Sequence, residues 1–241
     1  MYDYFYEIER THWWSVSMRS VFHMLLVGAL RGAGRPRMVD VGCGTGITLE
    51  EFSRHGLVFG VDAAWQAVSF SKRRNPTRGV CQANVLSLPI AAETLDVVLA
   101  FDVIEHIEDD AAALREMHRV LRPEGVAVIN VPAFASLWSE KDVAAHHQRR
   151  YTRPMLNRLL QTTGFRVDRI TYTNAILFPA VWCVRAIQRL AKRPWNPEGE
   201  YRPRPWVNGG LAWLLRFELS ALRYFNLPCG TSVTCVARKV S

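Results

Sequence analysis

The feature that most constrains this chain is a glycine pattern behind a short apolar run, MVDVGCGTG at residues 38–46. The apolar residues on both sides of Asp40 are typical of a short buried strand, and the glycines follow where such a strand turns toward a helix. Because Gly42 and Gly44 have no Cβ, the main chain there can adopt positive φ angles and approach a bound molecule closely. A helix that begins near Gly46 would add free amide donors. The segment therefore predicts a ligand-binding turn between a strand and a helix.

The spacing of the glycines favours one kind of ligand over another. A dinucleotide-binding turn has the pattern G-x-G-x-x-G, with the pyrophosphate on the helix N-terminus. This chain has G-x-G-x-G, and Asp40 stands two residues before the first glycine. A fixed negative charge at that position would repel a pyrophosphate, so we expect a zwitterionic ligand instead.

Apolar runs and helix-like stretches alternate after residue 36, which is typical of parallel βαβ units. The expected strands are 38–41, 57–61, 80–85, 95–101, 126–131, 166–172 and 232–239, and the expected helices include 46–55, 64–74, 109–121 and 153–163. Gly125 is expected to end a helix, and Thr152 and Gly164 to cap the two ends of the helix at 153–163. The sequence thus predicts an α/β fold with a Rossmann-like, doubly wound, seven-stranded sheet.

Two helical regions are expected to lie outside this sheet. A helix at 17–31 predicts an N-terminal helical cap at residues 1–35, and two helical stretches around the proline-broken loop 194–206 predict a helical lid insertion at 173–231. The core would then comprise 36–172 and 232–241. The insertion is expected to cover the active site or to form a dimer contact, although packing alone would also explain its apolar faces.

The segment VDVGCGTG resembles motif I of the class I S-adenosylmethionine-dependent methyltransferases, whose cofactor carries an amino group, a carboxylate and a sulfonium. LDVVLAFDVIEHI at 95–107 and LRPEGVAVINVPA at 121–133 resemble later motifs of the same family. The resemblance implies S-adenosyl-L-methionine as the cofactor, with the main chain near Phe101 at its methionine end. The expected cofactor-binding residues are Trp14, Arg19, Asp40, Gly42, Cys43, Gly44, Asp62, Ala63, Asn84, Val85, Phe101 and His106.

Several of these residues have expected roles. Asp62 closes the second strand, where one carboxylate can accept hydrogen bonds from both ribose hydroxyls, although an acid there could also cap a helix. Asn84 has an amide suited to adenine. Trp14 offers an aromatic face to the sulfonium, and Arg19 offers a charged pair for the cofactor carboxylate. The alternative for Trp13 and Trp14 is an aromatic staple that anchors a flap.

The candidate catalytic residues lie in the segment HHQRRY at 146–151. A hydroxyl or an indole-like carbon gains from a general base, and histidine is the side chain that titrates nearest neutral pH. We expect His147 as the base, His146 as the second candidate, and Tyr151 as a group that orients the acceptor. The alternative is a basic loop whose arginines hold an anionic substrate or pair with nearby acids.

A metal site is a competing interpretation of the same region. Asp102, Glu105 and His106 form D-x-x-E-H, followed some forty residues later by His147, a spacing similar to the E-x-x-E-H…H metal site of small-RNA 2′-O-methyltransferases. Quinone-precursor O-methyltransferases carry a related cluster. A divalent ion there would lower the pKa of an acceptor hydroxyl. Against it, E-H at this point is common in family members without metal, so our expectation is no metal.

Composition and charge limit where the protein acts and what it binds. Residues 1–138 hold 13 Lys and Arg against 16 Asp and Glu, whereas residues 139–241 hold 17 against 6. This asymmetry suggests nucleic acid, a phospholipid surface or a phosphorylated substrate, or else solvated helix faces alone. The five cysteines contain no C-x-x-C pair, the opening segment is acidic, and the longest apolar run, 175–184, is about half of the ~20 residues that cross a bilayer. We expect a cytoplasmic protein with reduced thiols.

The function expected from these features is methyl transfer to a fairly apolar small-molecule substrate, at oxygen or an activated carbon. The aromatic residues of the insertion suggest an aromatic or prenylated acceptor. The segments YFYEIERTHWWS, HHQRRY and LPCGTSV look like those of a bacterial group of small methyltransferases linked to glycan or secondary-metabolite pathways. The alternatives are an RNA methyltransferase and a non-catalytic cofactor-binding partner subunit. We do not expect nucleic acid as a partner, whereas peripheral membrane contact and homo-oligomers through the insertion are open.

Overall fold

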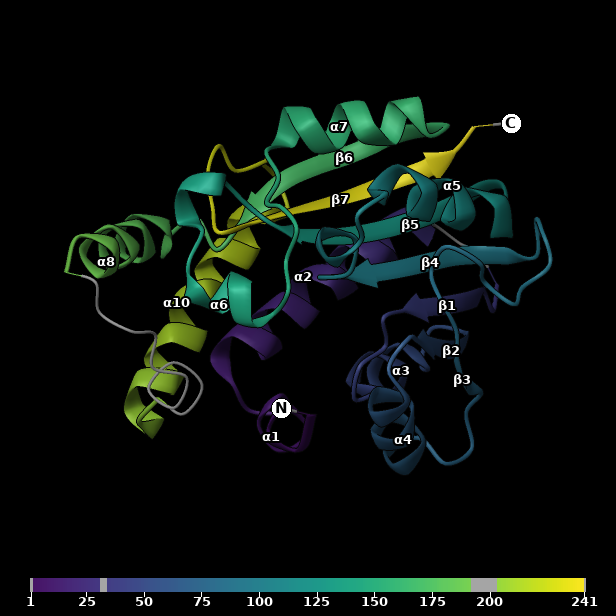
Figure 1. Ribbon diagram of the computed structural model, residues 1–241, viewed down its shortest axis with the longest axis horizontal. Helices are drawn as coiled ribbons and strands as arrows, with labels where there is room; N and C mark the ends of the chain where they lie inside the picture. The colour runs from purple at the N-terminus through teal and green to yellow at the C-terminus, as the bar shows by residue number, and fades with distance from the viewer. Residues whose placement is uncertain (1, 31–33, 192–202, 241) are drawn as a thin grey trace.

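A computed structural model describes residues 2–30, 34–191 and 203–240. Its centre is a seven-stranded sheet in the order β3-β2-β1-β4-β5-β7-β6 (Figure 1). Neighbouring strands are parallel except that β7 runs antiparallel to both β5 and β6. The strands are β1 Arg37–Val41, β2 Leu57–Asp62, β3 Val80–Gln82, β4 Leu95–Phe101, β5 Leu121–Pro132, β6 Phe165–Thr173 and β7 Ser232–Lys239. This topology confirms the predicted Rossmann-like, doubly wound α/β fold.

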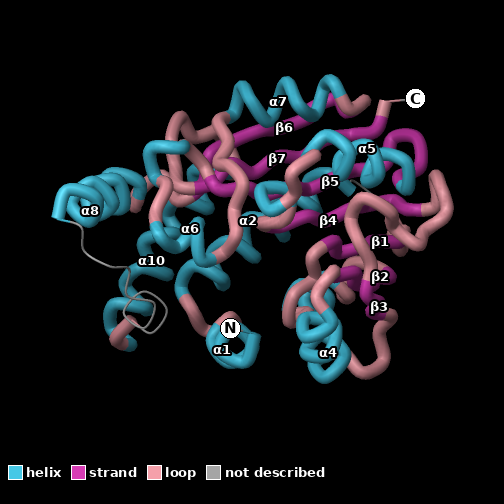
Figure 2. Tube along the Cα trace, viewed as in Figure 1, coloured by secondary structure: helices cyan, strands magenta, loops and turns pink. Residues whose placement is uncertain are grey.

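Helices cover both faces of the sheet (Figure 2). They are α1 Tyr2–Ile8, α2 Trp13–Leu30, α3 Ile47–Phe52, α4 Trp65–Arg74, α5 Asp110–Val120, α6 Glu140–Ala144, α7 Arg153–Thr162, α8 Phe178–Ala191 and α10 Pro205–Leu222, with the short 3₁₀ helices η1 Ile104–His106 and η2 Ala135–Leu137. None of the described helices is long and apolar enough to cross a membrane.

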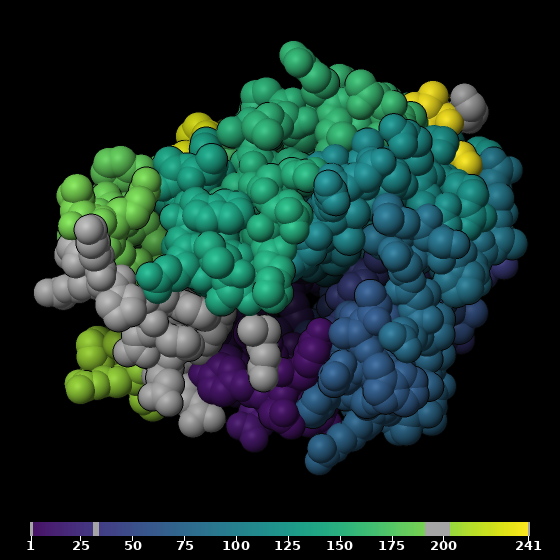
Figure 3. All heavy atoms as spheres, viewed as in Figure 1, coloured from purple at the N-terminus to yellow at the C-terminus, as the bar shows by residue number. Residues whose placement is uncertain are grey.

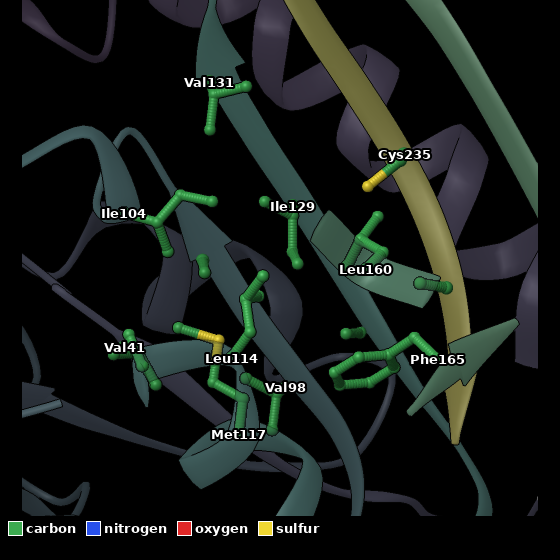
Figure 4. Packing of buried hydrophobic residues seen from close by; sticks show 14 of the residues in the cluster. Val41, Val98, Ile104, Leu114, Met117, Ile129, Val131, Leu160, Phe165 and Cys235 are labelled. Carbon is green, nitrogen blue, oxygen red and sulfur yellow. The ribbon is translucent and has the colours of Figure 1, made fainter. Parts of the chain in front are cut away.

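The core has two layers because successive residues of a strand point to opposite faces. In β4, Val98 packs in one buried cluster with α5 and α7, whereas its neighbour Leu99 packs in another with α2 and α3. Figure 4 shows Leu114 and Met117 of α5 in this first cluster, together with Val98 of β4 and Ile129 of β5. Burial on both faces explains why these strands are almost continuously apolar in the sequence.

Three elements differ in extent from the sequence predictions. Helix α2 begins at Trp13 instead of residue 17, and β3 ends at Gln82. The segment LRPE does not lead to a helix end at Gly125, because β5 already begins at Leu121. The pairing of β4 with β5 shifts register between residues 95 and 97, where Glu124 adopts a left-handed φ of 62°. Residues 122–125 therefore form an irregular, bulged part of the strand.

The connection between β6 and β7 contains α8 and α10. Helix α10 packs along α2, and Asn208 accepts a hydrogen bond from the Trp13 amide at 2.9 Å and donates to the Thr11 carbonyl at 2.9 Å. The buried carboxylate of Glu218 accepts hydrogen bonds from the amides of Asn174 and Ile176. Most of the predicted loop 194–206 lies outside the described residues. The insertion is thus fastened to the N-terminal helices.

Candidate active site

The glycine turn has the backbone that the sequence predicts. Gly42, Gly44 and Gly46 have φ angles of 69°, 52° and 82°. A Cβ at Gly42 would lie 2.6 Å from a methyl group of Val103, whereas a Cβ at Gly44 would have no neighbour within 4 Å. The turn therefore packs against Val103 at Gly42 and faces open space at Gly44. Such open space beside a main chain is what a ligand-binding turn needs.

Two carboxylates stand at this turn. Asp62, at the end of β2, accepts a hydrogen bond from the Gly44 amide at 2.9 Å and another from the Ala64 amide at 2.9 Å. Asp40 is buried in β1, and its Oδ2 has no hydrogen-bond partner among the described residues. Burial and the nearby charge of Asp62 raise the pKa of Asp40 well above its usual value. The turn thus presents an unsatisfied acid.

Four other predicted cofactor residues lie around these two acids. The Cys43 thiol is buried 3.9 Å from the Ser71 hydroxyl, and burial raises its pKa. The Ala63 carbonyl follows β2 and accepts from the Gln82 side chain, which links this loop to β3. After β3, the Asn84 side-chain oxygen accepts a hydrogen bond from the Leu86 amide at 2.9 Å, and Val85 is buried. These residues surround the edge of the sheet where an adenosine group is expected.

The predicted contacts from α2 take a different form in the structure. Arg19 donates to Glu51 of α3 at 2.8 Å and to the Glu9 carbonyl at 2.6 Å. Trp14 is partly buried against the core cluster of α2, as is the ring of Phe101, which stacks on Phe22 with centroids 3.8 Å apart. Arg19 is therefore held by protein acceptors, and roles for Arg19 and Trp14 toward the cofactor stay predictions.

The sequence analysis missed the contacts that Glu9, directly after α1, makes with the turn. Glu9 accepts hydrogen bonds from the Thr45 hydroxyl and from Arg74 of α4. Arg74 also donates to the Tyr6 carbonyl at 2.7 Å. Burial and the charge of Asp62 raise the pKa of Tyr2. In Figure 3 a hollow separates the purple N-terminal atoms from the teal surface.

A second cluster stands at the carboxyl ends of β4 and β5. His106 of η1 and His147 after α6 lie with ring centroids 4.7 Å apart and planes at 82°. His147 Nδ1 is 2.9 Å from the carboxylate of Asp142, which is fully buried. Arg150 donates to the same carboxylate at 2.8 and 3.0 Å. Although burial alone acts in the opposite direction, these hydrogen bonds hold the pKa of Asp142 well below its usual range.

Two further acids lie beside the histidines. Asp102 accepts a hydrogen bond from the Asn130 amide at 2.8 Å, and burial raises its pKa to about 6. Glu105 is fully buried, and neither of its carboxylate oxygens has a hydrogen-bond partner among the described residues. Burial and the charge of Asp102 raise the pKa of Glu105 well above its usual value. Burial and the charge of His147 lower the pKa of His106.

Part of this chain is similar to known proteins. Residues 39–129 match the family described as a methyltransferase domain. A probable S-adenosylmethionine-dependent methyltransferase of Mycolicibacterium smegmatis is 33% identical over 145 residues, which cover 58% of this chain and 55% of that protein. Residues 39–129 are thus similar to a methyltransferase domain, and this likeness supports a class I S-adenosylmethionine-dependent methyltransferase. The name of this relative gives S-adenosylmethionine as the cofactor of that protein.

A second relative and one solved structure extend the comparison. A ubiquinone biosynthesis O-methyltransferase of Cereibacter sphaeroides is 33% identical over 97 residues, 38% of this chain and 39% of that protein. The chain thus spans about half or less of the length of these two curated relatives. The crystal structure of a putative sarcosine dimethylglycine methyltransferase from Galdieria sulphuraria has a TM-score of 0.63 at 17% identity, over 92% of this chain and 86% of that chain. At this identity the likeness shows the fold alone.

The residues at the glycine turn fit S-adenosylmethionine. The unpartnered, buried Oδ2 of Asp40 is an acceptor that lacks a donor, and the cofactor carries an ammonium group. The open space at Gly44 leaves main-chain atoms accessible. Asp62 already lies at the end of β2, beside the expected ribose position. The turn therefore offers an acid, open space and a strand-end carboxylate, which are groups that suit S-adenosylmethionine.

The two remaining catalytic candidates do not join the His106–His147 cluster. Tyr151 is buried, and its hydroxyl donates to Asp110 at 2.8 Å, so it is not free to orient an acceptor. Burial raises the pKa of this phenol further. His146 is exposed, with a left-handed φ of 57°. Among the described residues, one ligand atom from each of Glu105, His106 and His147 lies within 4.8 Å of the others, whereas Asp102 is outside this group.

Five aromatic residues in the described part of the insertion are exposed and do not enclose an acceptor pocket. Their side chains are between 46% and 72% exposed: Trp182, Trp206, Trp213, Phe217 and Phe225. A smaller aromatic group does lie at the end of β5, where Phe134 stacks on Tyr172 at 4.9 Å and approaches Phe178 of α8 at 5.4 Å. The protein therefore has an apolar wall there, and a membrane or dimer contact through α8 and α10 stays a prediction.

Proposed function

We propose that this methyltransferase transfers a methyl group from S-adenosylmethionine to a fairly apolar small molecule, at an oxygen or an activated carbon. The observation that carries the proposal is the position of two clusters at one edge of the sheet. The glycine turn follows β1, and the histidine cluster follows β4, its neighbour. Figure 1 shows both strands pointing toward the same side of the molecule. Ligands of open α/β sheets bind outside the carboxyl ends of the strands.

In this proposal the residues of the turn bind and orient the cofactor. S-adenosylmethionine supplies a methyl group on a positively charged sulfur, which is already an excellent leaving group. Asp62 would accept hydrogen bonds from the ribose hydroxyls, and Asp40 would supply the buried negative charge that faces the ammonium group. Gly42 and Gly44 allow the main chain to approach. Correct placement of two reactants can contribute effective molarities of about 10⁵ to 10⁸ M.

His147 is the group that would remove a proton from the acceptor. Its Nδ1 is engaged with Asp142, so Nε2 is the ring nitrogen that remains for an acceptor. A buried carboxylate on one nitrogen fixes the tautomer and orients the ring, as in other histidine bases. Arg150 and the Ser139 amide hold Asp142 in turn. These contacts order the segment HHQRRY around His147 and leave Tyr151 a structural part.

The aromatic residues after β5 support the proposed acceptor class. Phe134 and Phe178 are partly buried beside the end of β5, which favours an aromatic or prenylated molecule over a highly charged one. The likeness to a ubiquinone biosynthesis O-methyltransferase supports an oxygen of an aromatic ring. We place the reaction in a secondary-metabolite, glycan or lipid pathway.

Turnover with a panel of acceptors tests this proposal. Purified protein is incubated with S-adenosylmethionine and phenols, prenylated phenols, indoles, lipids or glycans, and the release of S-adenosylhomocysteine is measured. We expect turnover with at least one apolar aromatic acceptor and a loss of at least 100-fold in kcat for His147→Ala. Cofactor binding without turnover on any of these acceptors would contradict the proposal and favour a cofactor-binding partner subunit.

A further inference from the structure

Glu105 is a buried charge that the methyl-transfer proposal does not use. Its side chain has no solvent exposure, and both of its carboxylate oxygens lack a hydrogen-bond partner among the described residues. Its main chain is fixed, because its carbonyl accepts a hydrogen bond from the Gln148 amide at 2.7 Å. Burying an ionised carboxylate without a partner is costly, so such a group requires either a proton or a cation.

Two imidazoles face this carboxylate from different parts of the chain. A ligand atom of Glu105, one of His106 and one of His147 all lie within 4.8 Å of one another. His106 follows Glu105 directly on η1, whereas His147 is supplied by the segment after α6. The two rings lie edge to face, with centroids 4.7 Å apart and planes at 82°. Three donors that converge from two elements form a site that can hold one ion.

The contacts behind His147 prepare it as a ligand. Asp142 occupies Nδ1 at 2.9 Å and leaves Nε2 for a ligand bond. Asp142 is itself fixed by the Ser139 amide at 2.8 Å and by two hydrogen bonds from Arg150. Histidines that bind metals usually donate their other ring nitrogen to a carboxylate in this way, which fixes the ring and increases its basicity. The supporting carboxylate is therefore already in place.

We propose that Glu105, His106 and His147 bind one divalent transition-metal ion. Two imidazole nitrogens and one carboxylate oxygen suit zinc, manganese or cobalt better than magnesium, which prefers oxygen ligands alone. Three protein ligands leave at least one position open. The ion would neutralise Glu105, which has no other partner.

The consequence for the reaction rests on the proposed function. A metal at the carboxyl end of β4 would bind the acceptor through an oxygen atom, and a pair of neighbouring oxygens would bind best. The acceptor would then be a hydroxylated molecule, in line with O-methylation, and the metal would lower the pKa of the bound hydroxyl. His147 would act as a ligand in that case, and the proton would leave to solvent.

Metal binding is measured on the untagged protein after dialysis against a chelator. Cobalt(II) is titrated in, and the visible ligand-field absorption of the bound ion is recorded; zinc is added separately in thermal unfolding. We expect one equivalent of cobalt to bind and zinc to raise the unfolding temperature. Glu105→Gln and His147→Ala should each weaken binding at least 10-fold, while circular dichroism shows that both variants remain folded.

His146→Asn is the matched control, because it removes the neighbouring imidazole and asparagine tolerates the left-handed backbone at that position. It should bind cobalt like the parent protein. Absence of cobalt, zinc and manganese binding at millimolar concentration, or equal binding in Glu105→Gln, would overturn the inference. Binding of S-adenosylhomocysteine to the same samples separates the two proposals: if it binds and metal does not, only the metal site fails.

Discussion

The cofactor turn and the histidine cluster stand at the ends of neighbouring strands, yet they are built in different ways. The turn is one continuous segment, 38–46, and its properties come from the missing side chains of its glycines and the open space at Gly44. The histidine cluster comes from η1 and the segment after α6, and its properties come from charged side chains buried together. A local motif encodes the first site, whereas the second depends on tertiary packing.

The two sites also differ in how their charges are compensated. The carboxylate of Asp142 is hydrogen-bonded to Ser139, His147 and Arg150. Its charge is therefore compensated within the protein. Asp40 and Glu105 each keep an unpartnered oxygen among the described residues. We interpret these two acids as the places where each site receives a positive group from outside. The following variants test whether the two sites are as independent as this comparison implies.

Asp142→Ala should have the largest effect. It leaves the guanidinium of Arg150, whose side chain is 11% exposed, without its main partner. Breaking a buried ion pair by removing one member typically costs about 3–5 kcal/mol of unfolding free energy. Denaturant unfolding measures this loss. In the folded fraction, the affinity for S-adenosylhomocysteine should stay within about twofold, and a parallel loss of cofactor binding would contradict independent sites.

Gly42→Ala should act on the other site. A side chain there requires a left-handed φ of 69°, which costs roughly 1–2 kcal/mol, and its Cβ would lie 2.6 Å from Val103. Calorimetry should show a loss of cofactor affinity of at least 10-fold. Gly28→Ala is the matched control, since its Cβ would have no neighbour within 4 Å and α2 should retain its packing. Equal affinity in Gly42→Ala and Gly28→Ala would be the contrary result.

Glu105→Gln should stabilise the metal-free protein at neutral pH. The pKa of Glu105 is raised in the folded state, so the folded protein holds its proton more tightly than the unfolded chain. Parent stability therefore falls as the pH rises from the unfolded pKa of about 4.3 toward the folded value. The variant should lack this loss and gain about 1–3 kcal/mol at pH 8, with little gain at pH 4. Unfolding curves at both pH values, with chelator present, provide the comparison.

Tyr151→Phe should have the smallest effect. The Tyr151 hydroxyl donates to Asp110, which also pairs with Arg149 at 2.7 Å, so its removal leaves the carboxylate satisfied. We expect a loss of about 1 kcal/mol in unfolding free energy. Methyl transfer should change less than twofold. A large drop in kcat with unchanged stability would contradict this and show that Tyr151 takes part in methyl transfer.

The cofactor half of the site could be predicted because interactions between residues close together in the sequence determine its backbone. The strand, the glycine turn and Asp62 are each set by residues that lie close together in the sequence. The helix at 153–162 was predictable for the same reason: the Thr152 hydroxyl accepts from the Met155 amide at its start, and Gly164 has a φ of 92° beyond its end. Turns and caps of this kind depend little on the rest of the molecule.

The acceptor half could be predicted only in part. The sequence names His106 and His147, but tertiary packing brings these two imidazoles together from separate segments, and the folded turn after α6 sets Asp142, five residues earlier, against His147. Nothing local shows that Asp142 supports His147, or that the Tyr151 hydroxyl turns inward to Asp110. The contacts of Glu9 with Thr45 and Arg74 are missing from the sequence analysis for the same reason. Long-range ion pairs carry no periodicity in the sequence.

Isothermal titration calorimetry of the intact protein tests the central claim most directly. The account predicts that S-adenosylhomocysteine binds with one molecule per chain, and that Asp62→Ala weakens this binding at least 10-fold without unfolding the protein. It also predicts no measurable heat with a nicotinamide or flavin dinucleotide. Binding of a dinucleotide in the absence of any signal from S-adenosylhomocysteine would contradict the account.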